Sequence, residues 1–203
     1  MLQTFTVGES TLVLLKRLQQ VPMFQDLRLV GGTALALQLG HRNSIDLDFF
    51  GVFDKTMEQI VEELEARKFN VNPYHISKII KILYVNDVKV DIVGGHREWL
   101  CPPIETEGVR MASLQDIAAM KLHAITGRGR KKDFIDLYFL LQHFSLEQMI
   151  EFYEKKYSQN SLFFVIRSLS YFNDAESDPM PDMFIDVSWE EMKATIRNAI
   201  ENF

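Results

Sequence analysis

Two short clusters of residues near the start of the chain have the types and spacing that phosphate chemistry requires. Gly31 and Gly32 precede a short apolar segment, and Asp46 and Asp48 follow it with one residue between them. Backbone N–H groups at a glycine turn bind phosphate, and carboxylates bind divalent cations. The spacing therefore predicts a site for phosphoryl or nucleotidyl transfer, in which backbone amides and a metal ion hold the same phosphate.

Local patterns indicate the elements that would position these residues. Residues 27–30 are typical of the end of a buried strand, residues 33–39 of a short helix ended by Gly40, and residues 44–50 alternate as a strand does. The two aspartates then lie on one face of that strand, about 6–7 Å apart along the chain. Each cluster alone is also typical of a tight turn or of a solvated edge strand. Their combination around one helix favours the phosphate site.

A third carboxylate follows in a predicted β-hairpin. Residues 78–93 alternate as two strands around Asn86 and Asp87, residue types that tolerate the positive φ of a tight turn. Asp91 then lies on the second strand, on the same face as Lys89. If this strand is adjacent to the one with the aspartate pair, Asp91 would complete a metal shell or accept the proton of an attacking hydroxyl. The alternative is a solvent-facing aspartate on an antiparallel hairpin.

Three cationic features are further candidates to contact phosphate. Arg42 precedes the aspartate pair, and it either binds a phosphate or pairs with one of the two carboxylates. Lys121 lies at the edge of the apolar stripe of a helix that Ser113 begins, and it either points toward a triphosphate or lies on the surface. Residues 127–132 hold four cations, which suits an RNA backbone but is also typical of a solvated loop.

Two acidic residues come directly after this basic segment. Asp133 is at the start of the next predicted helix, where the helix dipole favours an anion, and Asp136 follows one turn later on the same side. The pair either takes part in nucleotide binding or orients a Lys or Arg side chain and caps the helix.

Together these motifs resemble the AbiEii/AbiGii-type nucleotidyltransferase-like toxins of the polymerase-β-like nucleotidyltransferase superfamily. The resemblance is most specific over residues 31–49, continues at residues 119–137, and spans residues 27–141. It implies a Mg²⁺-dependent transfer of a nucleotide from an NTP to an acceptor hydroxyl such as that of tRNA. It also implies a toxin of an abortive-infection system, with a cognate antitoxin protein as partner. The Gly-Gly-Thr turn departs from the Gly-Ser of the wider superfamily, as it does in the toxin branch.

The resemblance assigns roles residue by residue. The implied phosphate-binding turn is Gly31, Gly32 and Thr33, the metal-binding carboxylates are Asp46, Asp48 and Asp91, and the later motif residues are Lys121, Asp133 and Asp136. Arg42 joins the nucleotide-binding set, and Lys121 would balance charge on the transferring phosphate. Two other functions stay open. One is nucleotidyl transfer to a small molecule such as an aminoglycoside-like antibiotic, and the other is a non-catalytic nucleotide- or protein-binding module of the same fold.

Composition limits the class of protein. The chain has 203 residues, 47% of them hydrophobic and 25% charged, with a formal net charge of −6, which are globular values. The single cysteine excludes an intrachain disulfide, and the negative charge restricts any RNA contact to a local basic surface. The start does not resemble a signal peptide, and no apolar run approaches the ~18 residues of a membrane span. These features predict a cytoplasmic protein without membrane insertion.

The order of patterns predicts an α+β fold, with a nucleotidyltransferase-like mixed sheet and flanking helices followed by an all-helical C-terminal region. The predicted domains are residues 1–103 and 104–203, with residues 101–108 as a hinge. Serines with capping patterns at positions 113, 145 and 188 mark helix starts in the second domain. The site is predicted in the cleft between the domains, where ligand sites are common.

Overall fold

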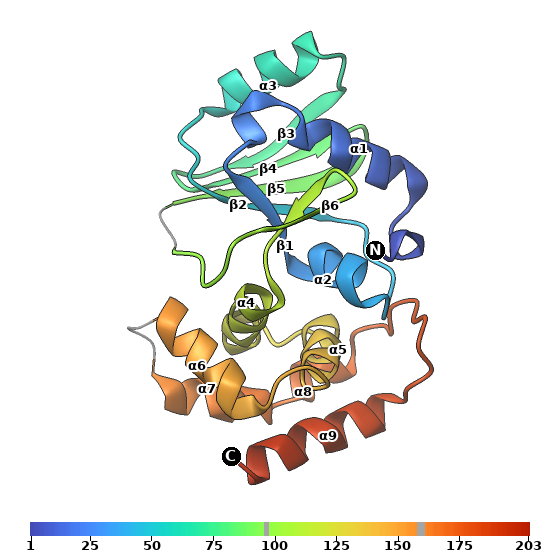
Figure 1. Cartoon of the computed structure of the whole chain (residues 1–203), viewed down its shortest axis with the longest axis vertical. Helices are drawn as coiled ribbons and strands as arrows, with labels where there is room; N and C mark the ends of the chain where they lie inside the picture. The colour runs from blue at the N-terminus through green and yellow to red at the C-terminus, as the bar shows by residue number, and fades with distance from the viewer. Residues whose placement is uncertain (96–97, 158–160) are drawn as a thin grey trace. The chain divides into compact units, whose positions relative to one another are not determined.

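The computed structural model describes residues 1–95, 98–157 and 161–203, which form two compact units. We call them the sheet unit (residues 1–38, 44–97 and 103–112) and the helical unit (residues 39–43, 98–102 and 113–203). Figure 1 shows the elements of both units along the chain.

The sheet unit is a mixed seven-stranded sheet in the order β3-β4-β5-β2-β1-β7-β6. Central strand β2 runs antiparallel to β1 and parallel to β5, and β1 also pairs in parallel with β7. The strands are β1 Leu27–Val30, β2 Leu47–Gly51, β3 Val71–Ile76, β4 Ile80–Val85, β5 Val88–Gly94, β6 Ile104–Thr106 and β7 Val109–Met111. Its helices are η1 Thr4–Thr6, α1 Glu9–Gln19, η2 Pro22–Phe24, α2 Gly31–Leu39 and α3 Met57–Ala66.

Alternation along β2 and β5 builds the core and leaves one face for polar side chains. Phe49 on β2 and Ile92 on β5 are fully buried, whereas the aspartates on the same strands are half-buried on the opposite face. Phe24 packs edge-on against Phe49 with ring centroids 5.1 Å apart. The hydrophobic face therefore fixes the register that aims the aspartates.

The local predictions for this unit are confirmed, apart from the limits of two elements. β1 spans the predicted residues, and the β4–β5 turn has positive φ at Asn86 (48°) and Asp87 (66°). Helix α2 begins at Gly31, two residues earlier than predicted, so both glycines are in its first turn. Strand β2 begins at Leu47 instead of residue 44, and Ile45 before it is 66% exposed.

The hinge predicted at residues 101–108 overlaps a β-hairpin, and the helices begin only after this hairpin. Residues 104–111 form the β6–β7 hairpin, whose Gly108 has φ +79°. Strand β7 joins the sheet through its contact with β1, where Leu29 pairs with Met111. Val109 and Met111 are buried there, so tertiary pairing stabilises a strand too short to show in the local pattern.

The helical unit consists of α4 to α9 together with short flanking segments. Helix α4 packs against α5, α6 and α7, and α9 packs against α5. The serine caps are confirmed, since Ser113, Ser145 and Ser188 each accept a hydrogen bond from a backbone N–H of the first helical turn. The helices are α4 Leu114–Gly127, α5 Lys131–Leu140, α6 Leu146–Lys156, α7 Leu162–Leu169, α8 Asn173–Glu176 and α9 Trp189–Glu201. Within the described segments, no helix has the length and apolar character needed to cross a lipid bilayer.

Candidate functional site

Two of the three predicted carboxylates of the sheet unit lie on neighbouring strands. Asp48 on β2 lies directly opposite Asp91 on β5 in the parallel register, and adjacent strands are about 4.8 Å apart. Strand β5 is thus adjacent to β2, which is the condition that the sequence set for Asp91 to join the aspartate pair. Asp91 is 20% exposed, and its Oδ1 is buried without a hydrogen-bond partner among the described residues. A buried carboxylate oxygen without a partner is costly unless a ligand satisfies it.

Asp46 is held by its backbone at the entrance to β2. The buried hydroxyl of Thr33 donates a hydrogen bond to the carbonyl oxygen of Asp46, and it also lies 2.8 Å from the hydroxyl oxygen of Ser44. Helix α2 and the segment before β2 are therefore tied together at the predicted phosphate turn. Thr33 contributes to the geometry of the carboxylates through this tie.

The glycine turn lies against the carboxylate of Asp48. Gly31 has φ +69°, a conformation that favours glycine, and a β-carbon added there would collide with the side chain of Asp48. Gly32 follows in the first turn of α2, where backbone N–H groups have no intrahelical acceptor. The structure thus brings the glycine turn and a carboxylate to one place.

Lys89 is an unanticipated member of this cluster. Its Nζ donates a hydrogen bond to Asp91 Oδ2 at 2.6 Å. Burial lowers the pKa of Lys89, but the hydrogen bond to Asp91 and the charges of Asp91, Asp46 and Asp48 raise it above its ordinary value. The alternating pattern of β5 already placed Lys89 on the face of Asp91, and this was the signal available in the sequence.

The carboxylates suit a divalent cation chemically, but Asp91 is already bound to Lys89. Over residues 1–95, 98–157 and 161–203, no three His, Cys, Asp or Glu side chains are grouped so that they could hold a metal ion. Mg²⁺ commonly uses one or two protein carboxylates, with substrate phosphates and water completing its shell. The Asp48–Asp91 pair, with the unpartnered Asp91 Oδ1, fits that smaller requirement.

Gly31→Ala is expected to abolish NTP binding and to destabilise the protein by more than the ~1–2 kcal/mol of a left-handed alanine. The added methyl group meets Asp48, so the carboxylate must move. Isothermal titration with Mg²⁺ and NTP, together with urea unfolding, measures both effects.

Gly108→Ala is the matched control for this substitution. Gly108 has φ +79°, but a β-carbon there would meet nothing within 4 Å. Its backbone strain is therefore similar, and we expect NTP binding to stay unchanged. Equal NTP binding by both variants would show that the turn at Gly31 does not face the nucleotide.

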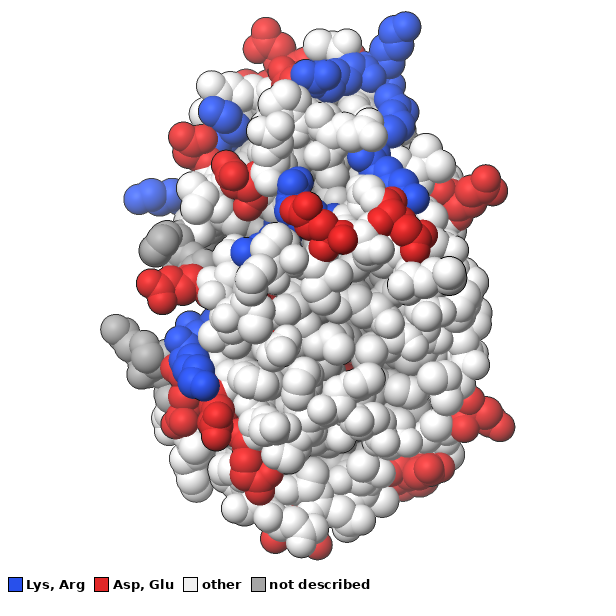
Figure 2. All heavy atoms as spheres, viewed as in Figure 1, with Lys and Arg blue, Asp and Glu red and all other residues white. Residues whose placement is uncertain are grey.

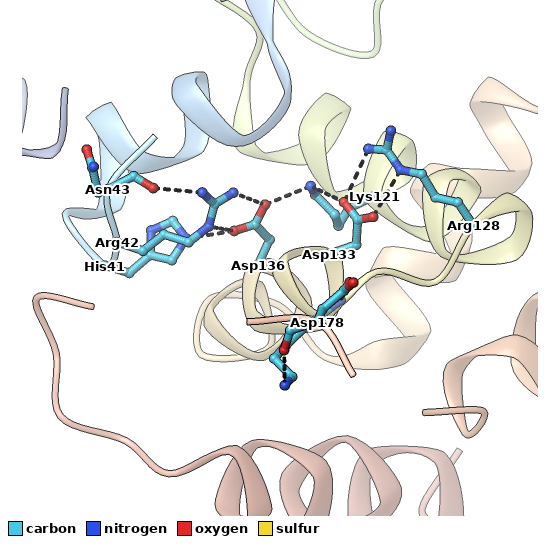
Figure 3. A network of polar contacts seen from close by, with 9 residues as sticks. His41, Arg42, Asn43, Lys121, Arg128, Asp133, Asp136 and Asp178 are labelled. Carbon is cyan, nitrogen blue, oxygen red and sulfur yellow. Dashed lines mark hydrogen bonds and ion pairs between the residues drawn. The ribbon is translucent and has the colours of Figure 1, made fainter. Parts of the chain in front are cut away.

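The later motif residues meet in the helical unit, where they form a buried ionic network (Figure 3). Asp136 is fully buried, and it accepts hydrogen bonds from Arg42 Nε at 2.7 Å and Nη2 at 2.9 Å and from His41 Nε2 at 2.8 Å. Lys121 Nζ lies 2.7 Å from Asp136 Oδ2 and 3.0 Å from Asp133 Oδ1. Arg128 Nε completes the network 3.1 Å from Asp133. The bidentate Arg42–Asp136 pair gives the network a defined geometry.

Charge compensation dominates the ionisation of this network. Burial raises the pKa of Asp136, but the charges of Arg42 and Lys121 and the hydrogen bonds from His41 and Arg42 hold it well below its ordinary value. For Asp133, burial likewise raises the pKa, and Lys121 and Arg128 bring it below the ordinary value. Lys121 shows the reverse balance, since burial lowers its pKa and the two carboxylates raise it above the ordinary value. All three groups are therefore charged at neutral pH.

These contacts decide several alternatives that the sequence left open. Lys121 is 5% exposed, so the interpretation as a surface lysine is wrong. Asp133 and Asp136 orient Lys and Arg side chains, as one interpretation proposed. Arg42 binds Asp136, a partner that the sequence did not indicate.

The basic segment of residues 127–132 is only partly exposed. Lys131 is buried, and its Nζ donates hydrogen bonds to the backbone of Glu176 and Asp178. Arg128 is bound to Asp133 with its side chain 58% exposed, and Arg130 and Lys132 are exposed as well. On the face shown in Figure 2, basic and acidic side chains are interspersed among the described residues. The segment thus presents fewer cations to solvent than its composition suggests.

Comparisons with known proteins match this architecture over nearly the whole chain. A family model described as nucleotidyl transferase AbiEii toxin, type IV TA system, matches residues 13–202. An uncharacterized protein from Aquifex aeolicus (strain VF5) is 30% identical over 198 residues, which cover 93% of both chains.

Solved structures show the same fold at low identity. MenT4, a nucleotidyltransferase toxin from Mycobacterium tuberculosis H37Rv, matches with a TM-score of 0.60 and 16% identity over 92% of this chain and 82% of that one. ANT(2'')-Ia in complex with adenylyl-2''-tobramycin matches with a TM-score of 0.55 and 16% identity over 76% of this chain and 100% of that one. The chain therefore belongs to the AbiEii nucleotidyl transferase toxin family of type IV toxin–antitoxin systems.

Proposed function

We propose that this protein transfers a nucleotide from an NTP to an acceptor hydroxyl with the help of Mg²⁺. The observation that carries the proposal is the pairing of Asp48 with Asp91 beside the Gly31 turn. Bound there, Mg²⁺ would neutralise phosphate charge and polarise the bond to the leaving pyrophosphate. Phosphoryl transfer asks mainly for positioning and charge stabilisation, which suits carboxylates and backbone amides.

Each residue of the sheet unit then has a role in this reaction. The backbone N–H groups of Gly31, Gly32 and Thr33 would bind the triphosphate, and Asp46 and Asp48 would be metal ligands. Asp91 would share the metal ion and accept the proton of the acceptor hydroxyl through its unpartnered Oδ1.

The ionic network of the helical unit is proposed to serve nucleotide binding as a fixed unit. Lys121 and Arg42 are held by Asp136, and Asp133 fixes Lys121 from the other side. A cation held in this way keeps its position without reorganisation during the reaction. We propose Lys121 and Arg42 as the positive groups of this site, and Asp133 and Asp136 as their positioning residues.

For the acceptor, we propose an RNA such as tRNA, in a cytoplasmic toxin that is countered by a cognate antitoxin protein. Family membership supports the toxin role, and exposed Arg130 and Lys132 support contact with an RNA backbone. The likeness to ANT(2'')-Ia, whose complex holds an adenylylated antibiotic, supports a small-molecule acceptor as the second candidate.

Label transfer tests the proposal. The protein is incubated with each α-³²P-labelled NTP, Mg²⁺ and either total RNA or a panel of aminoglycosides. We expect label in nuclease-sensitive RNA, and we expect its loss with a chelator and in Asp46→Ala. Asp54→Ala is the control, because the Asp54 side chain is 87% exposed and lies outside the site.

The other outcomes distinguish the remaining functions. Label on an aminoglycoside would establish the small-molecule activity instead. Calorimetric binding of Mg²⁺ and NTP without any release of pyrophosphate would identify a non-catalytic module. Equal label transfer by Asp46→Ala and the unmodified protein would contradict the proposed site.

A further inference from the structure

The side chain of Lys89 lies within the carboxylate cluster that we propose for the metal ion. Lys89 and Asp91 are two residues apart on β5, so both point to the same face of the sheet, and Asp48 lies opposite Asp91 on β2. The Lys89 side chain is 32% exposed, and its Nζ is 2.6 Å from Asp91 Oδ2. A positive group of the protein is therefore already present where a divalent cation would bind.

All three carboxylates act on this ammonium group. Asp91 binds it directly through Oδ2, and the charges of Asp46 and Asp48 act on it from further away. Lys89 thus places a positive charge beside Asp91, which lies opposite Asp48 on the adjacent strand.

Lys89 provides a hydrogen bond to only one of the two carboxylate oxygens of Asp91. Asp91 Oδ2 receives the hydrogen bond, but Asp91 Oδ1 is buried and has no partner among the described residues. An ammonium group carries one charge and three donors on a flexible stem, whereas Mg²⁺ carries two charges and binds several oxygens at once. A divalent cation that replaced the ammonium group would therefore neutralise more of the negative charge of the carboxylates.

We propose that Lys89 is a resident counter-ion that competes with the divalent cation for Asp91 and leaves this carboxylate when the metal ion binds. The inference rests on the proposed metal-dependent function. It makes Lys89 a positioning residue that sets metal affinity, since a metal ion on Asp91 Oδ1 would bring two further positive charges beside the ammonium group on Oδ2. Free metal would then bind weakly, and a metal ion that arrives with an NTP would gain the additional contacts of the glycine turn.

Metal binding by Lys89→Gln tests this competition. Isothermal titration with Mg²⁺, and with Mn²⁺ as a second probe, is expected to give up to about fivefold tighter binding than in the unmodified protein. Lys16→Gln is the matched control, because it removes the same charge from a half-buried lysine on α1, which packs against β7. We expect its metal affinity to be unchanged.

A second measurement follows the lysine directly in the unmodified protein. Acetylation of Lys89 by a small amine-reactive ester, quantified by mass spectrometry, should become several-fold faster when Mg²⁺ is added, because the ammonium group leaves Asp91. Acetylation of Lys16 should not change. Metal affinity thus tests the competition for Asp91, and acetylation tests the release of Lys89.

The remaining outcomes separate this inference from the proposed function. Equal metal affinity in Lys89→Gln and the unmodified protein, or an equal gain in both lysine variants, would overturn the competition and leave the label-transfer result intact. Weaker metal binding by Lys89→Gln would overturn it as well, since Lys89 would then support the metal site. Absence of metal binding in every variant would overturn both the competition and the metal dependence.

Discussion

Asp48→Asn is expected to reduce nucleotide transfer by about a thousandfold with little change in stability. Asparagine keeps the shape of the side chain on β2 but removes the charge opposite Asp91. Metal-assisted stabilisation of phosphate charge is worth several kcal/mol, and each ~1.36 kcal/mol is a factor of ten in rate. Initial rates of α-labelled NTP transfer at saturating Mg²⁺ measure the loss.

Asp87→Asn provides the matched control for this charge removal. Asp87 is exposed in the β4–β5 turn, and asparagine tolerates its φ of 66°. We expect its transfer rate to equal that of the unmodified protein, and the free energy of unfolding of both variants to stay within ~0.5 kcal/mol. A rate for Asp48→Asn within a factor of ten of the unmodified protein would place the metal ion elsewhere.

Asp136→Ala is expected to lower the free energy of unfolding by about 3–5 kcal/mol. Asp136 is fully buried and shared by Arg42, His41 and Lys121. Removing it leaves two cations in the interior without the carboxylate that they share, which costs more than the pair itself contributes. Equilibrium unfolding in urea, followed by helical circular dichroism, measures the loss.

Asp186→Ala is the control, because Asp186 is an exposed aspartate of the same unit. We expect a change within ~0.5 kcal/mol for this variant. If Asp136→Ala lost no more than the control, the network would contribute nothing measurable to the folded state.

The same prediction has a pH signature whose sign follows from the lowered pKa of Asp136. In the unfolded chain this carboxyl titrates near ~3.9, whereas in the folded protein it stays ionised to lower pH. Its contribution is therefore complete above the unfolded-state value and is lost as the pH falls toward the folded-state value. Asp133 acts in the same direction. Unfolding between pH 5 and 2 should become less pH-dependent in Asp136→Asn, and an unchanged slope would contradict the assignment.

Short-range patterns in the chain were sufficient to predict most helices and strands. Ser113, Ser145 and Ser188 start helices through hydrogen bonds within one turn, and the Asn86–Asp87 turn depends on two residues alone. Such features depend on residues adjacent in sequence, so a single chain displays them. Hairpin β6–β7 was missed, because β7 is stabilised by pairing with β1, about eighty residues earlier in the chain.

The residue types of the candidate site could also be predicted from the sequence alone. A glycine pair, an aspartate pair and a later Lys-Asp-x-x-Asp pattern indicated nucleotidyl transfer, and family membership agrees. The contacts that these side chains make could not be predicted from the sequence. The face of Lys89 followed from alternation, but its position among three carboxylates required the parallel pairing of β2 with β5.

Only the tertiary structure determines which charged residues pair, because the two members of a buried pair can be far apart in the sequence. Arg42 and Asp136 are 94 residues apart in sequence, yet they form a buried bidentate pair. A buried charge is stable only beside an opposite charge. Local sequence patterns do not show which residue provides that opposite charge. The order of residues thus specified the elements and the chemistry available, while long-range pairing of strands and compensation of buried charge selected which groups meet.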